Sequence, residues 1–189
     1  DMVQSRGLGD VYKRQIVNEP GLASSVHWSK VNRPISPAVF DHLLKSTQKH
    51  LNSATTLFVK DMHCGADPAH TMPVRLVSES AWHSAFMHNM FIRSHRDSLS
   101  THVPEFTILH APTMTVDPKE YGVNSEVFVV ISLSRGIVLI GGTRYAGEIK
   151  KSIFTIMNHI LPSRGLLPMH CSATVSYTHL RAHETGPYL

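Results

Sequence analysis

The sequence predicts an α/β fold in which a mixed β-sheet is flanked by helices. Two runs of apolar, largely β-branched residues, at 126–133 and 136–142, have the composition and length of strands. The segment 147–161 instead repeats its apolar residues at helical spacing. Similar strands and helices alternate along the rest of the chain, and this interleaving is typical of the α/β class.

The first long helix is expected directly after Ser36. Serine is a good helix cap and Pro37 suits the first helical position, so the helix is expected to continue through 38–51. Its apolar stripe begins with Val39, Leu43 and Leu44.

A strand pair and a second helix are expected next. Residues 57–61 are predicted to form a short buried strand, followed by a loop over 63–70. Residues 73–79 alternate in polarity, as a strand does when Val74, Leu76 and Ser78 share one face. A helix is then expected over Ser80–Phe91, because large apolar residues recur there every fourth position: Trp82, Phe86 and Met90.

The second half of the chain continues this alternation. A strand is expected at 106–111, and the runs at 126–133 and 136–142 are predicted to form a hairpin or a pair of adjacent strands. The following helix should end at Pro162, since proline cannot continue it. Its apolar face is broad and comprises Ile149, Ile153, Ile156, Met157 and Ile160. A last strand is expected at 169–175.

The two ends differ from the middle of the chain. Residues 1–15 and 176–189 show neither helical nor strand periodicity, and DVYKRQ and SYTHLRAHET resemble translated adapter sequence. We therefore expect a non-native leader, a domain over 16–175 and a non-native tail, with weak packing at both ends. The alternative is that both ends are genuine flexible termini.

Composition excludes several classes of function. The chain is 42% hydrophobic and 17% charged, with a formal net charge of +4, which indicates a globular domain. The basic residues are scattered, so a nucleic-acid-binding domain, which needs a continuous Lys/Arg face with exposed aromatic residues, is not expected. No apolar run approaches the ~20 residues of a membrane span. The two cysteines lie far apart, so a reducing, cytoplasmic location is expected.

The segment GGTRYAGEIKK, at 141–151, has the composition of a ligand-binding loop. Its glycines allow sharp turns and close backbone approach, and Arg144, Lys150 and Lys151 surround the expected start of a helix. Cations are disfavoured at that positive end, so they indicate either an exposed turn or a bound anion. Two neighbouring ammonium groups also disfavour each other's charge, and a neutral lysine can donate its lone pair to a metal ion. Alternatively, both lysines lie on a helix surface.

A second candidate is His170, in the segment MHCS. Imidazole is the commonest side-chain metal ligand, but the chain has 14 histidines, and a single histidine is more often a structural residue than a ligand. Neighbouring residues of a strand point to opposite faces, so Cys171 is not expected to ligate the same ion and is predicted to be buried and inert.

These segments together resemble the ATP-dependent phosphoenolpyruvate carboxykinases. GGTRYAGEIKK is similar to that family's G-G-T-W-Y-G-G-E-M-K-K segment, and LLPMHCSATV to its M-H-C-S-A-N-V strand. PVRLVSESAWHSAFMHNMFIR, VNRPISPAVFDHLL, DMHCGADP and GVNSEVFVV also have counterparts in the family. The resemblance covers roughly residues 16–175 and implies a partial N-terminal, substrate-binding domain.

The resemblance also implies a role for four residues. Lys151 matches a lysine that binds catalytic Mn²⁺ as a neutral amine, and His170 matches a histidine ligand of that ion. Lys150 matches a lysine near the transferred phosphate, and Tyr145 matches a tyrosine at the carboxylate or CO₂ side of the substrate. Lys150, Lys151 and Tyr145 would thus be catalytic residues, and Lys151 and His170 would also lie near the nucleotide phosphates.

The implied reaction converts oxaloacetate and Mg²⁺-ATP to phosphoenolpyruvate, CO₂ and ADP, a step of gluconeogenesis. The chain contains no G-x-x-x-x-G-K-[ST] loop, and a third metal ligand, an aspartate, would lie downstream with the C-terminal nucleotide-binding domain. We therefore expect this chain alone to be inactive. The alternative is a catalytically silent α/β fragment with weak metal or anion binding. Family residues are replaced by Arg144, Ala146 and Thr174.

Overall fold

The computed structural model of the chain describes residues 14–22, 24–29, 32–175 and 180–184. These residues belong to two compact units, Asp1–Ile153 and Phe154–Leu189. Within the described residues, no helix is both long enough and apolar enough to cross a membrane.

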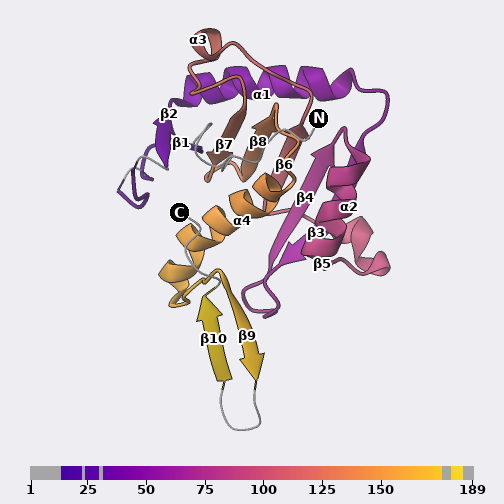
Figure 1. Cartoon of the computed structure of the whole chain (residues 1–189), viewed down its shortest axis with the longest axis vertical. Helices are drawn as coiled ribbons and strands as arrows, with labels where there is room; N and C mark the ends of the chain where they lie inside the picture. Colours follow the sequence, from indigo (N-terminus) through magenta and orange to yellow (C-terminus); the bar gives the residue numbers. More distant parts are fainter. Residues whose placement is uncertain (1–13, 23, 30–31, 176–179, 185–189) are drawn as a thin grey trace. The chain divides into compact units, whose positions relative to one another are not determined.

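The first unit is built on an eight-stranded sheet (Figure 1), which confirms the expected α/β class. The strand order is β2-β1-β7-β8-β6-β4-β3-β5. The strands are β1 (Gln15–Val17), β2 (Arg33–Ile35), β3 (Phe58–Cys64), β4 (Met72–Ser78), β5 (Ile92–Arg93), β6 (Phe106–Ala111), β7 (Phe128–Ser132) and β8 (Ile137–Gly141).

The sheet is mixed, as the sequence predicts. Strands β4, β6 and β8 run parallel to one another, while β7 pairs antiparallel with β8. This last pair is the expected hairpin, and Gly136 closes its turn with a φ of 61°. Because β4, β6 and β8 are parallel, the loops that follow them emerge at one edge of the sheet.

Four helices of the first unit are described completely within it: α1 (Pro37–Asn52), α2 (Ala81–Met90), the 3-10 helix η1 (Arg96–Thr101) and α3 (Pro118–Tyr121). The hydroxyl of Ser36 accepts a hydrogen bond from the backbone N–H of Val39, so Ser36 caps α1 as predicted. A further helix, α4 (Gly147–Ile160), begins in the first unit and confirms the helical spacing of its sequence.

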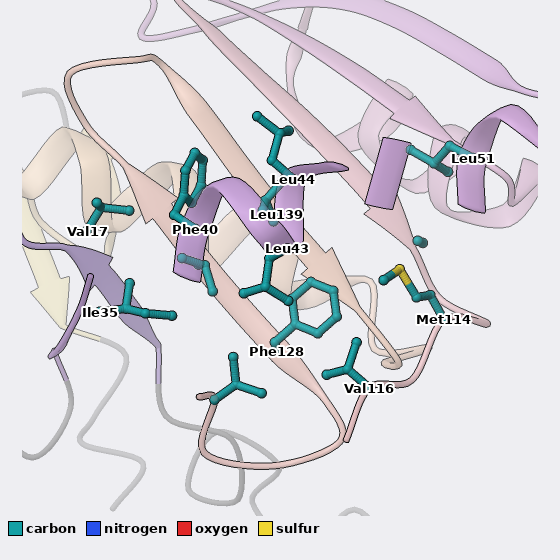
Figure 2. Close-up of a cluster of buried hydrophobic side chains, with 13 residues drawn as sticks. Val17, Ile35, Phe40, Leu43, Leu44, Leu51, Met114, Val116, Phe128 and Leu139 are labelled. Carbon is teal, nitrogen blue, oxygen red and sulfur yellow. The ribbon is translucent and has the colours of Figure 1, made fainter. Parts of the chain in front are cut away.

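Helix α1 lies across β6, β7 and β8 (Figure 1), and the main hydrophobic core fills the space between them. Phe40, Leu43, Leu44 and Leu51 of α1 belong to this cluster, and Leu43 lies against the ring of Phe128 (Figure 2). Leu43 and Phe40 are fully buried. Removing these apolar side chains from water stabilises the packing of the helix against the sheet.

The opposite face of the sheet is also buried. On the central strands the side chains that alternate with the core cluster point away from α1. Most are apolar and fully buried: Val74, Leu76, Ile108, Val129, Ile131, Val138 and Ile140. Two polar residues, Ser78 and His110, occupy the same face and stand opposite each other where β4 pairs with β6. The alternation predicted for β4 is therefore confirmed.

The predicted helix is confirmed as α2, and its buried side is not the one that carries Trp82 and Met90. Trp82 is 63% exposed and Met90 45% exposed, whereas His83, Ser84 and Met87 are buried. Periodicity gives the repeat of a helix but not the side that its neighbours cover. Here α2 packs beside β3 and β4 with the face that carries His83 and Met87 turned inward.

Strand β3 also differs from its prediction. It extends from Phe58 to Cys64 and takes in the first residues of the expected loop, and of its seven residues only Met62 is buried. The strand lies near the edge of the sheet, because its outer neighbour β5 has only two residues. Few neighbouring elements cover a strand near the edge of a sheet, so most of its side chains stay partly exposed.

The end segments are described only in part, and their described residues differ from expectation. Gln15, assigned to the leader, is 5% exposed and pairs with Val130 in β1. In the second unit α4 ends at Ile160, close to Pro162 as expected. A 3-10 helix, η2 (Leu161–Arg164), follows it. The expected last strand is β9 (Cys171–Val175), and it pairs antiparallel with β10 (Leu180–Glu184), for which periodicity predicted no strand. Residues 1–13, 176–179 and 185–189 lie outside the described part of the chain.

Candidate functional site

The segment GGTRYAGEIKK lies at the carboxyl ends of the parallel strands. Gly141 is the last residue of β8, and α4 begins at Gly147, so the loop between them spans residues 142–146. Loops at this edge of an open α/β sheet are the usual location of ligand sites. The loop therefore lies where ligand-binding loops of this fold class are usually found.

The backbone of this loop is held by specific hydrogen bonds. Gly142 has a φ of 74°, a left-handed conformation that favours glycine, and its N–H donates to the carbonyl of Ala111 over 3.1 Å. The N–H of Tyr145 donates to the hydroxyl of Thr143 over 3.1 Å. The N–H of Glu148 donates to the carbonyl of Tyr145 and begins α4. The loop is thus a folded turn that leads into a helix.

The structure brings two of the predicted site residues together. The Nζ of Lys151 lies 4.9 Å from the centroid of the Tyr145 ring. At this distance a cationic amine is attracted to the electron-rich face of an aromatic ring. Tyr145 is 43% exposed and the Lys151 side chain 39%, so both can be reached from solvent.

A buried carboxylate, which the sequence analysis missed, lies beside Lys151. The side chain of Glu148 is 1% exposed, and its two oxygens face two cations. The Nζ of Lys151 donates to Oε1 over 3.4 Å, and the Nε of Arg14 lies 3.7 Å from Oε2. A buried carboxylate needs such partners. The i,i+3 spacing of Glu148 and Lys151 was the signal that could have revealed the pair.

These contacts bear on the expected state of Lys151. A carboxylate at hydrogen-bond range and a ring face are both partners of a charged ammonium group. Binding a metal ion through Nζ requires the neutral amine instead. Nζ of Lys151 would therefore have to lose a proton before it could ligate a metal ion, and its remaining N–H groups could still donate to Glu148.

The other two predicted residues are placed separately. Lys150 is half-buried in the first turn of α4. His170 belongs to the second unit, where it is exposed, directly precedes β9 and lies with its ring centroid 5.8 Å from that of Phe154. Cys171, expected to be buried, is partly exposed, and neither it nor Cys64 is in a disulfide.

A pair of histidines lies behind the loop. His83 of α2 and His110 of β6 are 2% and 0% exposed, and their ring centroids are 4.3 Å apart. The Nε2 of His83 lies 3.0 Å from the carbonyl oxygen of Arg144, and its Nδ1 lies 2.8 Å from the hydroxyl of Ser80. Burial lowers the pKa of His83 below its ordinary value and that of His110 to about 3. Both rings are therefore neutral at neutral pH.

A Mn²⁺ ion needs several donor side chains around one point. Among the residues that the structure describes, no three histidine, cysteine, aspartate or glutamate side chains cluster to hold a metal ion. The amine of Lys151 and the imidazole of His170 are nitrogen donors, and both side chains are open to solvent. Each donor by itself suits a metal ion that takes its other ligands from elsewhere.

A family model described as phosphoenolpyruvate carboxykinase matches residues 9–182. This match confirms the resemblance seen in the sequence and extends into both end segments. It covers the loop, α4 and His170.

Individual relatives show the same likeness. The phosphoenolpyruvate carboxykinase (ATP) of Geobacter sp. (strain M21) is 49% identical over 158 residues, which is 84% of this chain and 30% of the relative. The protein of the same name from Geobacillus kaustophilus is 48% identical over 162 residues, 86% of this chain and 31% of its own length. One from Moorella thermoacetica is 46% identical over 164 residues. The chain thus spans about 30% of the length of the curated relatives that it matches.

Proposed function

The chain belongs to the phosphoenolpyruvate carboxykinase family, and on this premise we propose that it is part of an ATP-dependent phosphoenolpyruvate carboxykinase. The complete protein would convert oxaloacetate and ATP to phosphoenolpyruvate, CO₂ and ADP in gluconeogenesis, in the cytoplasm. The observation that carries the proposal is the position of Tyr145, Lys150 and Lys151 within a matched segment at the carboxyl edge of the sheet. Two cysteines that lie outside any disulfide suit a reducing compartment.

Within that protein each predicted residue would have one main task. Lys151 and His170 would hold a Mn²⁺ ion, which supplies Lewis-acid stabilisation of the enolate oxygen that forms when CO₂ leaves. Lys150 would offset negative charge on the transferred phosphoryl group, where the protein mainly positions groups and balances charge. Lys151 and His170 would also lie near the phosphates of Mg²⁺-ATP.

Tyr145 would orient the substrate carboxylate. Its ring is placed by the turn of the loop and by contact with Lys151, so its hydroxyl has a restricted range of positions. Restricting a substrate contact in this way lowers the entropy cost of reaching the reactive geometry.

We further propose that residues 16–175 form part of the substrate domain and that the nucleotide-binding domain lies in another part of the complete protein. The chain covers 30% of its relatives' length, and a third metal ligand and a phosphate-binding loop are missing from its sequence. This chain alone would then bind Mn²⁺ weakly and form no phosphoenolpyruvate. The end segments 1–15 and 176–189 would contribute no catalytic residue, although Arg14 contacts Glu148.

Electron paramagnetic resonance of free Mn²⁺ tests the metal assignment. Titrating the pure chain should lower the free-ion signal, and Lys151→Ala and His170→Ala should each weaken binding at least tenfold. Lys150→Ala, which changes the neighbouring lysine of the same helix, is the matched control and should bind within about threefold of the original chain. Equal weakening by all three variants would contradict the assignment.

A coupled assay of the same sample tests inactivity. The chain, supplied with oxaloacetate, ATP, Mg²⁺ and Mn²⁺, should form no phosphoenolpyruvate above the background rate. Phosphoenolpyruvate formation that depends on both ATP and Lys151 would contradict this prediction, because two protein ligands of the metal ion would then be enough for activity.

A further inference from the structure

The peptide group that joins Arg144 to Tyr145 is held at both of its ends. Its carbonyl oxygen accepts a hydrogen bond from Nε2 of His83, at 3.0 Å. Its N–H donates to the hydroxyl of Thr143, at 3.1 Å. A peptide group is planar, so fixing both the carbonyl and the N–H fixes the orientation of the whole plane. The Cα of Tyr145 is part of that plane, and the direction in which its side chain leaves the loop follows from it.

The hydrogen bond from His83 defines the tautomer of its ring. A backbone carbonyl can only accept, so Nε2 must carry a proton. The neutral ring then has an unprotonated Nδ1, which accepts from the Ser80 hydroxyl at 2.8 Å. Because His83 is only 2% exposed, water does not compete well for either nitrogen.

A second layer of buried polar groups holds His83 itself. The N–H of Ser80 donates to the hydroxyl of Ser78, which also contacts Nδ1 of His110 at 2.9 Å. The ring of His110 is fully buried and lies 4.3 Å from that of His83, at an angle of 42°. These contacts therefore link the imidazole of His83, which reaches the loop, to the first turn of α2 and to the ends of β4 and β6.

We propose that His83 is a positioning residue for Tyr145, acting through the Arg144 carbonyl. The side chain comes from α2, an element 61 residues earlier in the sequence, and connects the rigid sheet to the one loop that carries the exposed ring. The effect of His83 on substrate binding rests on the proposed role of Tyr145, whereas its effect on the conformation of the loop does not. His83 itself would touch no substrate. It would fix the position of Tyr145, which does.

Two variants of His83 separate its two hydrogen bonds. The amide nitrogen of glutamine can occupy the place of Nε2, so His83→Gln keeps a donor for the Arg144 carbonyl. The shorter asparagine places its amide near Nδ1, so His83→Asn keeps a partner for Ser80 and loses the bond to the loop. Both variants replace the imidazole by an amide, which makes them a matched pair.

Amide hydrogen exchange of the whole chain, followed by NMR without metal or substrate, is the test. In His83→Asn the amides of Tyr145 and Glu148 should exchange about fivefold faster, the effect of losing one hydrogen bond, while amides of β6 and β8 keep their rates. In His83→Gln all these rates should stay within about twofold of the original chain. Equal acceleration in both variants, or acceleration that affects the sheet and the loop alike, would overturn the proposal.

A measurement on the unaltered chain keeps the proposal testable if an asparagine variant does not fold. The ¹⁵N shifts of the His83 ring should show a protonated Nε2 and an unprotonated Nδ1 at neutral pH, with a slowly exchanging ring proton. The opposite tautomer would refute the hydrogen bond to Arg144. Neither experiment uses Mn²⁺, so a failure of the metal assignment would leave these outcomes unchanged.

Discussion

A methyl group added at position 147 tests the contact between Tyr145 and Lys151. The Cβ of an alanine at Gly147 would lie 2.5 Å from Cζ and 2.6 Å from Oη of the Tyr145 ring. Ordinary contact begins at about 3.4 Å, so the ring must move by about 1 Å. The clash involves the far end of a side chain that is 43% exposed, so the ring can swing away while the backbone stays in place.

The expected change in stability is the difference between two small effects. Alanine is a better helix former than glycine by up to about 1 kcal/mol, which favours α4. Displacing the ring from Lys151 Nζ, now 4.9 Å from its centroid, costs about 0.5–1 kcal/mol for a contact that is partly exposed. The free energy of unfolding of Gly147→Ala should therefore lie within about 0.5 kcal/mol of the original value, even though the site geometry changes.

A double-mutant cycle with Tyr145→Ala separates the two effects. Without the ring, Gly147→Ala has nothing to displace and should stabilise the chain by up to about 1 kcal/mol. Urea denaturation of the four proteins gives the coupling energy, which we expect to be about 0.5–1 kcal/mol. Strict additivity, or an unchanged NMR cross-peak between the Tyr145 ring and Lys151 Hε protons in Gly147→Ala, would refute the reasoning.

Three further predictions concern the scaffold. Gly141→Ala would place a Cβ 2.3 Å from the fully buried ring of Phe128 and should lower the free energy of unfolding by about 1–3 kcal/mol in urea titrations; a second change, Phe128→Leu, should recover part of this loss. Burial lowers the pKa of His110 to about 3, so His110 binds a proton more readily in the unfolded chain than in the folded one. The free energy of unfolding should therefore fall by up to about 1.4 kcal/mol per pH unit as pH drops from about 6.5 toward 3. His110→Asn should flatten that slope, and an identical slope in the variant would show that other groups cause it. Two hydrogen bonds from Arg75, at 2.6 and 2.8 Å, hold the pKa of Asp61 below 3.8. The pair therefore stabilises the fold above about pH 3.8, and this stabilisation is lost as pH falls through the lowered pKa of the folded state. Asp61→Asn should cost about 1 kcal/mol at pH 7, allowing for solvent at the partly exposed arginine, and the difference from the original chain should shrink as pH falls below about 3.8.

Features that depend on neighbours in sequence were predictable. The start of α1 follows from Ser36 and Pro37, because a cap and a first helical residue act within one turn. The alternation of β4 placed Val74, Leu76 and Ser78 on one face, and the structure buries all three. The family resemblance was equally readable, since several segments matched in the right order.

Features that depend on distant neighbours were not predictable in the same way. The stripe through Trp82 and Met90 has helical spacing, yet the opposite side of α2 is buried, because the sheet decides which side it covers. No prediction was made for Glu148, and only the fold places Arg14 and Lys151 against its buried carboxylate.

The sequence by itself therefore determined the α/β class, most of the strands and helices, the family, and the loop with Tyr145 that leads into the helix with Lys151. The tertiary structure alone decided that His83 and His110 meet behind that loop and that the Arg144 carbonyl faces the former. The reason is physical: local propensity acts over a few residues, whereas the partner of a buried polar group is selected by whichever distant segment packing brings within hydrogen-bond range.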